Sequence, residues 1–373
     1  MPERSDTEDG DPLGQASTLQ TWPDASGGEL RASQGLVGPY RLLQLLGEGG
    51  MGEVWQAEQL APLRRTVAVK VIKAGMDTRQ VVARFETERQ ALALMDHPAI
   101  AKVFDGGSTS EGRPYFVMEY VCGVPITEHC ATHRLSISAR LALFSEVCAG
   151  VQHAHQKAII HRDLKPSNLL VAVIDGKPQP KIIDFGIAKA TGCRLTQKTL
   201  FTELGAVIGT PEYMSPEQAE LSAQDIDTRT DVYSLGVVLY ELLTGVLPFS
   251  GEELRASKFG ELRHLLREVE PPRPSLRVAA LRKELDGDLD AITMKALSKE
   301  RDRRYGTPME LAADLGRYLR DEPVLARPPS KLYQLQRYVR RHRLVVAAGL
   351  GLLLLLLTFS ALMTVQARRM HLV

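Results

Sequence analysis

The chain has 373 residues, of which 44% are hydrophobic and 24% charged, and its formal net charge is +1. This length exceeds one average domain and accommodates a two-lobed enzyme of roughly 250–300 residues. Because the charges are nearly balanced, the composition gives no sign of nucleic acid or of a strongly acidic partner. Four cysteines without paired spacing indicate neither a disulfide framework nor a zinc site and are typical of a reducing compartment (Cys122, Cys130, Cys148 and Cys193).

The start of the chain is acidic and polar, unlike the basic and then apolar pattern of a secretory signal. Residues 1–36 are rich in Asp, Glu, Ser, Gly and Pro and show no apolar periodicity. We therefore expect a disordered segment over residues 1–39, with order beginning at Tyr40.

The first ordered part of the chain is predicted to be mainly β-structure. A strand is expected from Tyr40 to Leu46, before a glycine turn, and alternating residues from Thr66 to Ile72 predict another. Residues 79–95 carry apolar side chains at helical spacing and stop before His97-Pro98. The segment from Tyr115 to Val121 is again typical of a strand.

After Cys122 the pattern changes to long helices, predicted over residues 138–157, 231–244, 288–299 and 309–320. A β-rich lobe followed by an α-helical lobe is an α+β architecture with a cleft between the lobes. We therefore assign residues 40–320 to one bilobal domain. Residues 321–343 are predicted to be a stiff, basic linker that contains three prolines (Pro323, Pro328 and Pro329).

The stretch from Leu344 to Val365 contains 22 residues without a charge. At about 1.5 Å per residue a helix of this length matches the roughly 30 Å hydrocarbon core of a bilayer. A buried core helix is the alternative, but such a helix is seldom apolar on all sides for so long. The sequence therefore predicts one transmembrane helix over residues 344–365.

The flanks of this stretch suggest its orientation. More basic residues precede it than follow it (Arg337, Arg340, Arg341 and Arg343 before; Arg368 and Arg369 after). The positive-inside rule then places residues 1–343 in the cytoplasm of a single-pass cell-membrane protein. Ala347 and Gly351 form a small-xxx-small pair that would favour a homodimer. The tail over residues 366–373 fits either a tail anchor or a fragment of a longer chain.

A glycine-rich motif occupies residues 47–54, where Gly47, Gly49, Gly52 and Val54 fit G-x-G-x-x-G-x-V. Such a loop brings backbone N–H groups against phosphate oxygens because glycine has no Cβ. A dinucleotide-binding fold needs a helix after the loop, whereas residues 54–57 continue as an extended pattern. No Walker lysine follows. A β-hairpin that covers phosphates is therefore favoured.

The chemical groups of phosphoryl transfer lie in the run His161-Arg162-Asp163-Leu164-Lys165-Pro166-Ser167-Asn168. A carboxylate, an ammonium and a carboxamide two and three residues apart can orient a hydroxyl, neutralise a moving phosphoryl group and hold a metal ion. Sixteen residues later, Asp184-Phe185-Gly186 offers a second carboxylate on a flexible turn.

These motifs, in this order over residues 40–320, resemble the eukaryotic-like protein kinase family, in particular bacterial membrane-linked Ser/Thr kinases. The resemblance implies that Asp163 accepts or orients the proton of the attacking hydroxyl and that Lys165 stabilises the γ-phosphate of ATP. Asn168 and Asp184 would hold Mg²⁺, with Mn²⁺ as an alternative, because hard oxygen ligands suit these ions.

The resemblance also implies an ATP site. Lys70 would hold the α- and β-phosphates and pair with a helix glutamate, for which Glu88 fits the family pattern better than Glu86. The adenine would lie between the side chains of Val54, Ala68 and Leu170, with Met118 at the back of the pocket. The backbone groups of Glu119 and Val121 would read the edge of the base. Residues 122–125 depart from better-known kinases, so no ribose contact is assigned.

The segment Lys165-Pro166-Ser167-Asn168 resembles the corresponding segment of Ser/Thr kinases rather than that of tyrosine kinases. Residues 209–217 point to the same class, because they resemble the segment that binds the protein substrate, the substrate platform, with Thr210 near Asp163 and Lys165. Protein Ser/Thr hydroxyls are therefore the implied acceptors.

Other matches imply structural roles. Asp231 would anchor the backbone of the catalytic loop, Arg304 would pair with buried Glu217, and His161 would stack on Phe185. His153 and His155 lie two apart on a helix, which argues against a metal site.

Regulation is implied by Arg162, which would pair with a phosphothreonine between Asp184 and Glu217. Thr202 is the first choice, followed by Thr199 and Thr196. The second reading of the whole chain is a pseudokinase scaffold that binds nucleotide or partners without turnover. Its usual signature is loss of one of three residues that are intact here (Lys70, Asp163 and Asp184).

Overall fold

A computed structural model describes the chain over residues 35–49, 52–73, 94–185, 211–220, 227–256, 259–328 and 330–370. Within these ranges, side chains are not described at positions 253, 255, 256, 259, 340, 343–345, 360–362 and 364–370. Residues 35–39 are ordered and include a short strand at Leu36–Val37 that pairs with the strand beginning at Tyr40, so order begins earlier than predicted. The rest of the segment predicted to be disordered, and nearly all of the helix predicted over residues 79–95, lie outside the described residues.

The N-lobe is built on a six-stranded antiparallel sheet with the order β1-β2-β3-β4-β6-β5. The strands are β1 (Leu36–Val37), β2 (Tyr40–Gly49), β3 (Gly52–Gln59), β4 (Arg65–Ile72), β5 (Val103–Ser108) and β6 (Pro114–Glu119). The three predicted strands correspond to β2, β4 and β6. Residues 67–72 of β4 are buried, because this strand lies inside the sheet and its Val and Ile side chains pack well on a pleated surface.

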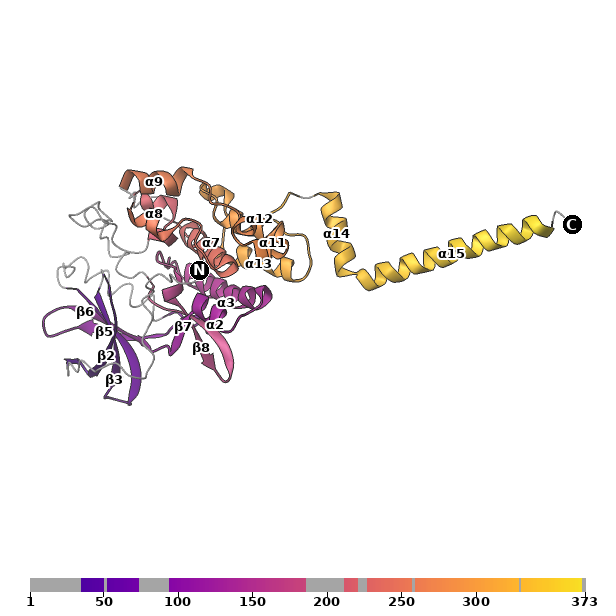
Figure 1. Ribbon diagram of the computed structural model, residues 1–373. Coiled ribbons are helices and arrows are strands. Elements are labelled where there is room, and N and C mark those ends of the chain that lie inside the picture. Colours follow the sequence, from indigo (N-terminus) through magenta and orange to yellow (C-terminus); the bar gives the residue numbers. More distant parts are fainter. Residues whose placement is uncertain are drawn as a thin grey trace, which may run out of the picture.

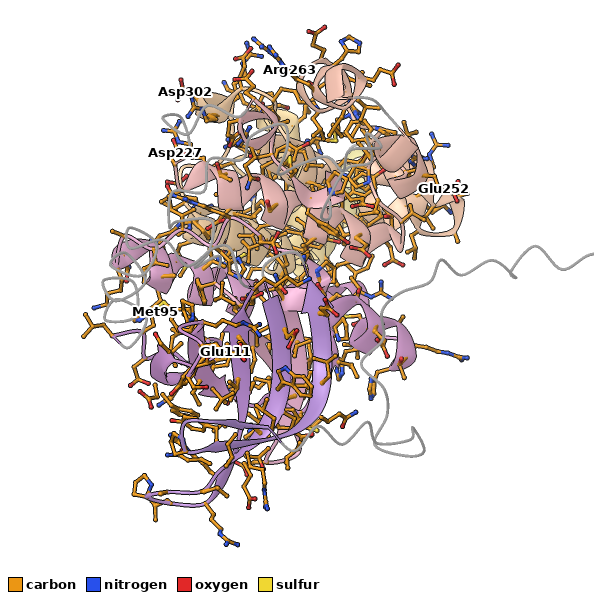
Figure 2. All side chains as sticks on the ribbon, turned by 90° about the vertical axis from the view of Figure 1, so that its left-hand side faces the viewer. Met95, Glu111, Asp227, Glu252, Arg263 and Asp302 are labelled. Atoms are coloured by element: carbon orange, nitrogen blue, oxygen red, sulfur yellow. The ribbon has the colours of Figure 1, made fainter. Side chains whose placement is uncertain are left out.

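The C-lobe is helical, with a small β7-β8-β9 sheet on the side of the N-lobe. Its strands are β7 (Gly123–Pro125), β8 (Leu169–Ile174) and β9 (Lys177–Ile182). Its α-helices are α2 (Ile126–Thr132), α3 (Ile137–Gln156), α6 (Pro216–Ala219), α7 (Arg229–Thr244), α8 (Gly251–Ala256), α9 (Phe259–Glu268), α10 (Pro274–Arg277), α11 (Arg282–Leu285), α12 (Asp288–Ala296) and α13 (Pro308–Leu319). Short 3₁₀ turns are η1 (Pro166–Asn168), η2 (Pro211–Tyr213), η3 (Ala279–Leu281) and η4 (Arg301–Arg303). Figure 2 shows the N-lobe, with Met95 and Glu111 labelled, below the helical C-lobe, with Arg263 and Asp302 labelled.

The core of the C-lobe forms around α7, most of whose residues are buried. At Gly236 a Cβ would lie 2.9 Å from the Ala296 side chain, so this glycine lets α7 approach α12 closely. Ser136 caps α3 by accepting a hydrogen bond from the Ala139 N–H, and Thr307 caps α13 in the same way. The predicted helices correspond to α3, α7, α12 and α13. Helix α12 ends three residues earlier than predicted, at Ala296.

Two helices follow the C-lobe (Figure 1), namely α14 (Lys331–Arg341) and α15 (Arg343–Met370). Helix α14 lies in the segment predicted to be a linker, where no helix was predicted. After the last proline, the chain can again form a helix, and Ser330 caps it by accepting from the Tyr333 N–H. Helix α15 contains the whole apolar stretch predicted to span a membrane. Among the described residues, however, no helix is sufficiently long and apolar to cross a bilayer.

Candidate active site

The two lobes meet at Lys70 and Asp184. Lys70 lies in β4, opposite Val54 of β3 and Phe116 of β6, and is 7% exposed. Asp184 follows β9 in a turn and has a left-handed φ of 56°. The Lys70 ammonium donates a hydrogen bond to Oδ1 of Asp184, although 114 positions separate the residues. The predicted convergence of these two residues is therefore present.

Three residues of the run 161–168, the predicted catalytic loop, form a second polar cluster. Lys165 Nζ lies 3.1 Å from Oδ2 of Asp163, and Asn168 Nδ2 donates to the Asp163 carbonyl oxygen at 2.8 Å and to Asp163 Oδ2 at 3.2 Å. The 3₁₀ turn η1 brings Asn168 back toward Asp163. The Asn168 carbonyl oxygen accepts from the Ile183 N–H at 2.9 Å, which fixes the loop beside the Asp184 turn.

The backbone of this loop is held by Asp231, in the first turn of α7. Its Oδ2 accepts from the His161 N–H and its Oδ1 from the Arg162 N–H, both at 2.8 Å. His155 Nε2 lies 2.7 Å from the same Oδ2. Burial alone would raise the pKa of Asp231, but its hydrogen bond and attraction to His155, together with His161, outweigh burial and hold the pKa below its ordinary value. The carboxylate is therefore ionised where it binds the loop.

His161 is a packing residue rather than an exposed base. Its ring is fully buried, and the ring centroid lies 4.7 Å from that of Phe185. Its Nε2 is 3.1 Å from the Ile183 carbonyl oxygen. Burial lowers the pKa of His161 more than the nearby carboxylates raise it. The predicted stacking of His161 on Phe185 is present.

The glycine motif forms the hairpin between β2 and β3. Gly47 pairs with Val54 and Gly49 with Gly52 in antiparallel register, so the extended continuation predicted from the sequence is present. The tip at positions 50 and 51 lies outside the described residues. A Cβ at Gly52 would lie 2.1 Å from the Val71 carbonyl oxygen, and its φ is 154°. Only glycine therefore fits where β3 passes β4.

The predicted adenine-side residues are mostly brought together. Ala68 and Met118 are cross-strand partners, each 7% exposed, and Val54 packs against the same hydrophobic cluster. Leu170 is buried in β8 of the C-lobe, at 4% exposure. Val54, Ala68 and Met118 thus belong to a cluster that continues into the C-lobe through Leu169 and Val171.

The segment that joins the lobes begins with Glu119. Its N–H donates to the Lys102 carbonyl oxygen at 2.8 Å, and its carboxylate pairs with Lys181 Nζ at 2.9 Å. Lys181 belongs to β9, so this ion pair ties the connecting segment to the C-lobe. Val121 is half-buried a little further along the chain.

The predicted pair of Glu217 and Arg304 is present and buried. Arg304 Nη1 donates to Glu217 Oε1 at 2.7 Å, and Nη2 donates to Oε2 at 2.9 Å, with side chains 0% and 5% exposed. Arg162, next to Asp163, has a left-handed φ of 63°, and its carbonyl oxygen accepts from Gln218 Nε2 at 2.8 Å. Gln218, the residue directly after the predicted substrate-platform segment, is thus hydrogen-bonded to the predicted catalytic loop.

Several predicted residues lie outside the described residues. These are the helix glutamate, Gly186, the platform threonine and the three proposed phosphosites (Glu88, Gly186, Thr210, Thr196, Thr199 and Thr202). Two residues that support the site were not predicted for these roles, namely His155 and Lys181. The spacing of His155 argued only against a metal site, and no local signal in the sequence identifies the partner of Lys181.

The donor set fits a divalent cation. Because Asn168 Nδ2 is directed at Asp163, the amide oxygen of Asn168 faces away from that residue, and Asp184 supplies carboxylate oxygens. Carboxylate and carboxamide oxygens are hard ligands of the kind that Mg²⁺ prefers. Among the residues that the structure covers, no group of three or more His, Cys, Asp or Glu side chains could hold a metal ion. The predicted ligands are instead one aspartate and one asparagine.

A six-stranded lobe whose lysine meets an aspartate of a helical lobe, beside an Asp-Lys-Asn cluster, defines a bilobal protein kinase fold. The chain belongs to the protein kinase family, because the family described as "Protein kinase domain" matches residues 40–314.

Individual relatives are bacterial. The chain is 40% identical over 289 residues to the serine/threonine-protein kinase PknB of Mycobacterium tuberculosis, with coverage of 76% of this chain and 43% of the relative. It is 39% identical over 272 residues to the serine/threonine-protein kinase Pkn1 of Myxococcus xanthus, with coverage of 72% and 37%. The chain thus spans less than half the length of these curated relatives. A crystal structure of the Mycobacterium tuberculosis PknI kinase domain is similar at TM-score 0.57 and 26% identity, with coverage of 77% and 98%.

Proposed function

We propose that the chain is a protein kinase that transfers the γ-phosphoryl group of ATP to serine and threonine hydroxyls of proteins. The observation that carries this proposal is the contact between Lys70 and Asp184 beside the cluster of Asp163, Lys165 and Asn168. Membership of the kinase family and the names of the bacterial relatives support the same activity.

The residues can divide the reaction among them. Asp163 lies with its carboxylate partly exposed and would accept the hydrogen bond of the acceptor hydroxyl, which orients an oxygen lone pair toward the γ-phosphorus. Lys165, 3.1 Å from that carboxylate, would stabilise the negative charge that develops on the transferred group. Lys70 would hold the α- and β-phosphates from the N-lobe side. Catalysis then depends mainly on positioning and on electrostatic stabilisation.

We assign the metal site to Asn168 and Asp184. A bound Mg²⁺, or Mn²⁺ in its place, would neutralise the phosphate oxygens and fix the leaving group. The Asn168 side chain is oriented for this by its two hydrogen bonds to Asp163. The Lys70 ammonium beside Asp184 supplies a second positive charge at the same phosphates.

The adenine site is proposed between Val54, Ala68 and Met118 above and Leu170 below, with backbone groups of Glu119 and Val121 toward the base edge. Burial of these aliphatic residues at the junction of the lobes supports the assignment. A pseudokinase is not favoured, because Lys70, Asp163 and Asp184 are all intact.

The test is phosphate transfer from labelled ATP with Mg²⁺ to a general protein substrate by the full chain. Asp163→Asn should lower the rate by at least 10²-fold, roughly the effect of losing one group that acts in the transition state. Asp175→Asn is the matched control, because Asp175 lies exposed in the β8–β9 turn at a φ of 51° that asparagine tolerates. Equal rates for Asp163→Asn and the wild type would refute the proposal, and phosphoamino-acid analysis distinguishes serine and threonine from tyrosine.

We further propose that the enzyme phosphorylates its own loop at Thr202, with Thr199 and Thr196 as secondary positions. A phosphate there adds about −1.5 to −2 charges, and Arg162 beside the catalytic aspartate offers a cation for it. Mass spectrometry after incubation with ATP and Mg²⁺ should find phosphate in this loop, and its absence from active enzyme would contradict the proposal.

We also propose that helix α15 anchors the kinase domain to the cell membrane, with residues 1–343 on the cytoplasmic side. Among the described residues no helix has the length and apolarity of a span, so the proposal depends on the uncharged stretch 344–365. It is supported by the unbroken helix over that stretch and by its outward leucines, such as Leu354 at 67% exposure. Alkaline carbonate extraction of membranes should leave the full chain in the pellet, whereas its release would contradict the anchor.

A further inference from the structure

One face of helix α14 is fixed to the C-lobe by a buried carboxylate. Asp288, at the start of α12, is 3% exposed and accepts hydrogen bonds from Tyr333 Oη at 2.8 Å and from the Arg337 guanidinium. Tyr333 Oη also accepts from the Val324 N–H at 3.0 Å. Tyr333 and Arg337 are four positions apart and so lie on the same side of α14. This side is therefore committed to the kinase domain.

The other side of α14 exposes an apolar stripe. Leu332, Leu335 and Val339 are 80%, 58% and 38% exposed. They are three and four positions apart and form one row. At about 100° per residue, the centre of this row lies roughly opposite the side that carries Tyr333 and Arg337. The side of α14 that carries Tyr333 and Arg337 is thus buried in the protein, whereas its apolar row is exposed.

The charges around the stripe point to an anionic partner. From Pro323 to Val373 the sequence has eight lysines and arginines and no aspartate or glutamate. Lys331 is exposed at the first turn of α14. Leu335 shares a groove with Asp321 and Glu322, whose carboxylates are paired with Arg337 and Arg341, each at 3.0 Å. An apolar row on a segment whose balance of charge is basic is the pattern of helices that lie in the interface of an anionic bilayer.

The direction of the chain agrees with such a position. Helix α14 runs crosswise to α15 (Figure 1), and His342 ends α14 just before α15 begins at Arg343. A helix that crosses the direction of a membrane anchor lies along the membrane surface. The anchor and the stripe would therefore meet the same leaflet.

We propose that α14 is an interfacial helix whose row of Leu332, Leu335 and Val339 inserts at the headgroup boundary of an anionic leaflet. Its opposite face, through Tyr333 and Arg337, holds the C-lobe against that leaflet. The proposal rests on the membrane anchor proposed above. Its consequence is that the kinase domain has a defined orientation on the membrane instead of moving freely on a linker.

The experiment places tryptophan at three exposed leucines of the full chain, Leu335→Trp in α14, Leu354→Trp in α15 and Leu63→Trp in the N-lobe. Each chain is reconstituted in vesicles of phosphatidylcholine and phosphatidylglycerol whose acyl chains are brominated near the glycerol or near the methyl end. Quenching is measured relative to the wild type, whose own tryptophans give the background. We expect bromine near the glycerol to quench Leu335→Trp, bromine near the methyl end to quench Leu354→Trp, and neither to quench Leu63→Trp.

The outcomes separate the two proposals. Quenching at position 354 without quenching at position 335 leaves the anchor intact and overturns the interfacial helix. No quenching at either position removes the anchor and the interfacial helix together. A blue-shifted but unquenched tryptophan at position 335 means that protein, such as a second copy of the chain, covers the stripe, which also overturns the proposal. Equal quenching at position 335 in phosphatidylcholine alone overturns the assignment of an anionic surface.

Discussion

The buried ion pair of Glu217 and Arg304 allows a quantitative test of how the C-lobe holds the substrate platform. Arg304→Met removes the guanidinium, keeps most of the aliphatic volume and leaves the Glu217 carboxylate buried beside the Thr230 hydroxyl, which donates to it at 2.8 Å. Removing one partner of such a pair costs about 3–5 kcal/mol, because the remaining charge is uncompensated. The carbonyl oxygens of Ser298 and Lys299 also lose donors, at 2.7 and 3.1 Å. We expect a loss of free energy of unfolding within that range.

The assay is urea unfolding of the full chain in detergent micelles, with a double-mutant cycle of Arg304→Met and Glu217→Gln. The double variant should lose less than the sum of the single variants, by about 0.5–3 kcal/mol, because no buried charge is then left alone. Arg303→Met is the matched control. Its pair with Glu300 is 73% and 65% exposed, so its loss should stay within about 1 kcal/mol. A loss below about 1 kcal/mol for Arg304→Met, or additivity in the cycle, would refute the reasoning.

Three further predictions concern the site and its support. Lys70→Met should lower phosphate transfer by at least about 10²-fold, because it removes the charge that meets Asp184. Lys73→Met, at a half-exposed lysine of the same lobe that pairs with Glu48, should leave the rate within about twofold in the same assay. His161→Gln should flatten the pH dependence of stability. Burial lowers the pKa of His161 in the folded chain, so the unfolded chain binds a proton first as the pH falls. The contribution of the neutral His161 to the free energy of unfolding is therefore fully present above about pH 6.5 and is lost as the pH drops below it. Urea unfolding at about pH 7 and pH 5 would contradict this if the wild type and variant lost stability equally. Gly52→Ala should lower the melting temperature by several degrees, because its Cβ would lie 2.1 Å from a carbonyl oxygen of β4, and an unchanged melting temperature would count against so close an approach of β3 to β4.

Periodicity was sufficient to predict the elements that bury one face or both. The alternating residues of β4 and the helical spacing of α3 and α7 each reflect a contact with one continuous core, so the pattern survives in the sequence. The extended residues after the glycine motif correctly favoured a hairpin over a dinucleotide-binding fold. The contact between Lys70 and Asp184 is different, because no local pattern relates residues 114 positions apart. It was predicted only through the resemblance to a family.

The errors have a physical cause. The prolines before Ser330 masked the helix that begins directly after it, although a capping serine followed by a basic and apolar row is a usable signal. The role of His155 depends on α3 and α7 lying side by side, where His155 Nε2 comes within 2.7 Å of the carboxylate of Asp231. A buried polar contact between two helices leaves no trace in the periodicity of either, so the spacing of the two histidines argued against a metal site but could not supply the partner of His155.

The structure also indicates why the catalytic loop needs this support. Arg162, within the predicted catalytic loop, and Asp184, in the proposed metal-binding turn, both have left-handed backbone conformations, with φ of 63° and 56°. For residues with a Cβ, such a conformation costs of order 1 kcal/mol or more, so neither position would hold it in isolation. Asp231 accepts from the Arg162 N–H, and the buried ring of His161 lies against Phe185, the residue after Asp184. The Asp231 carboxylate, in the first turn of the largely buried helix α7, therefore fixes the strained loop that carries the proposed base, and the contact of His161 with Phe185 links this loop to the proposed metal-binding turn.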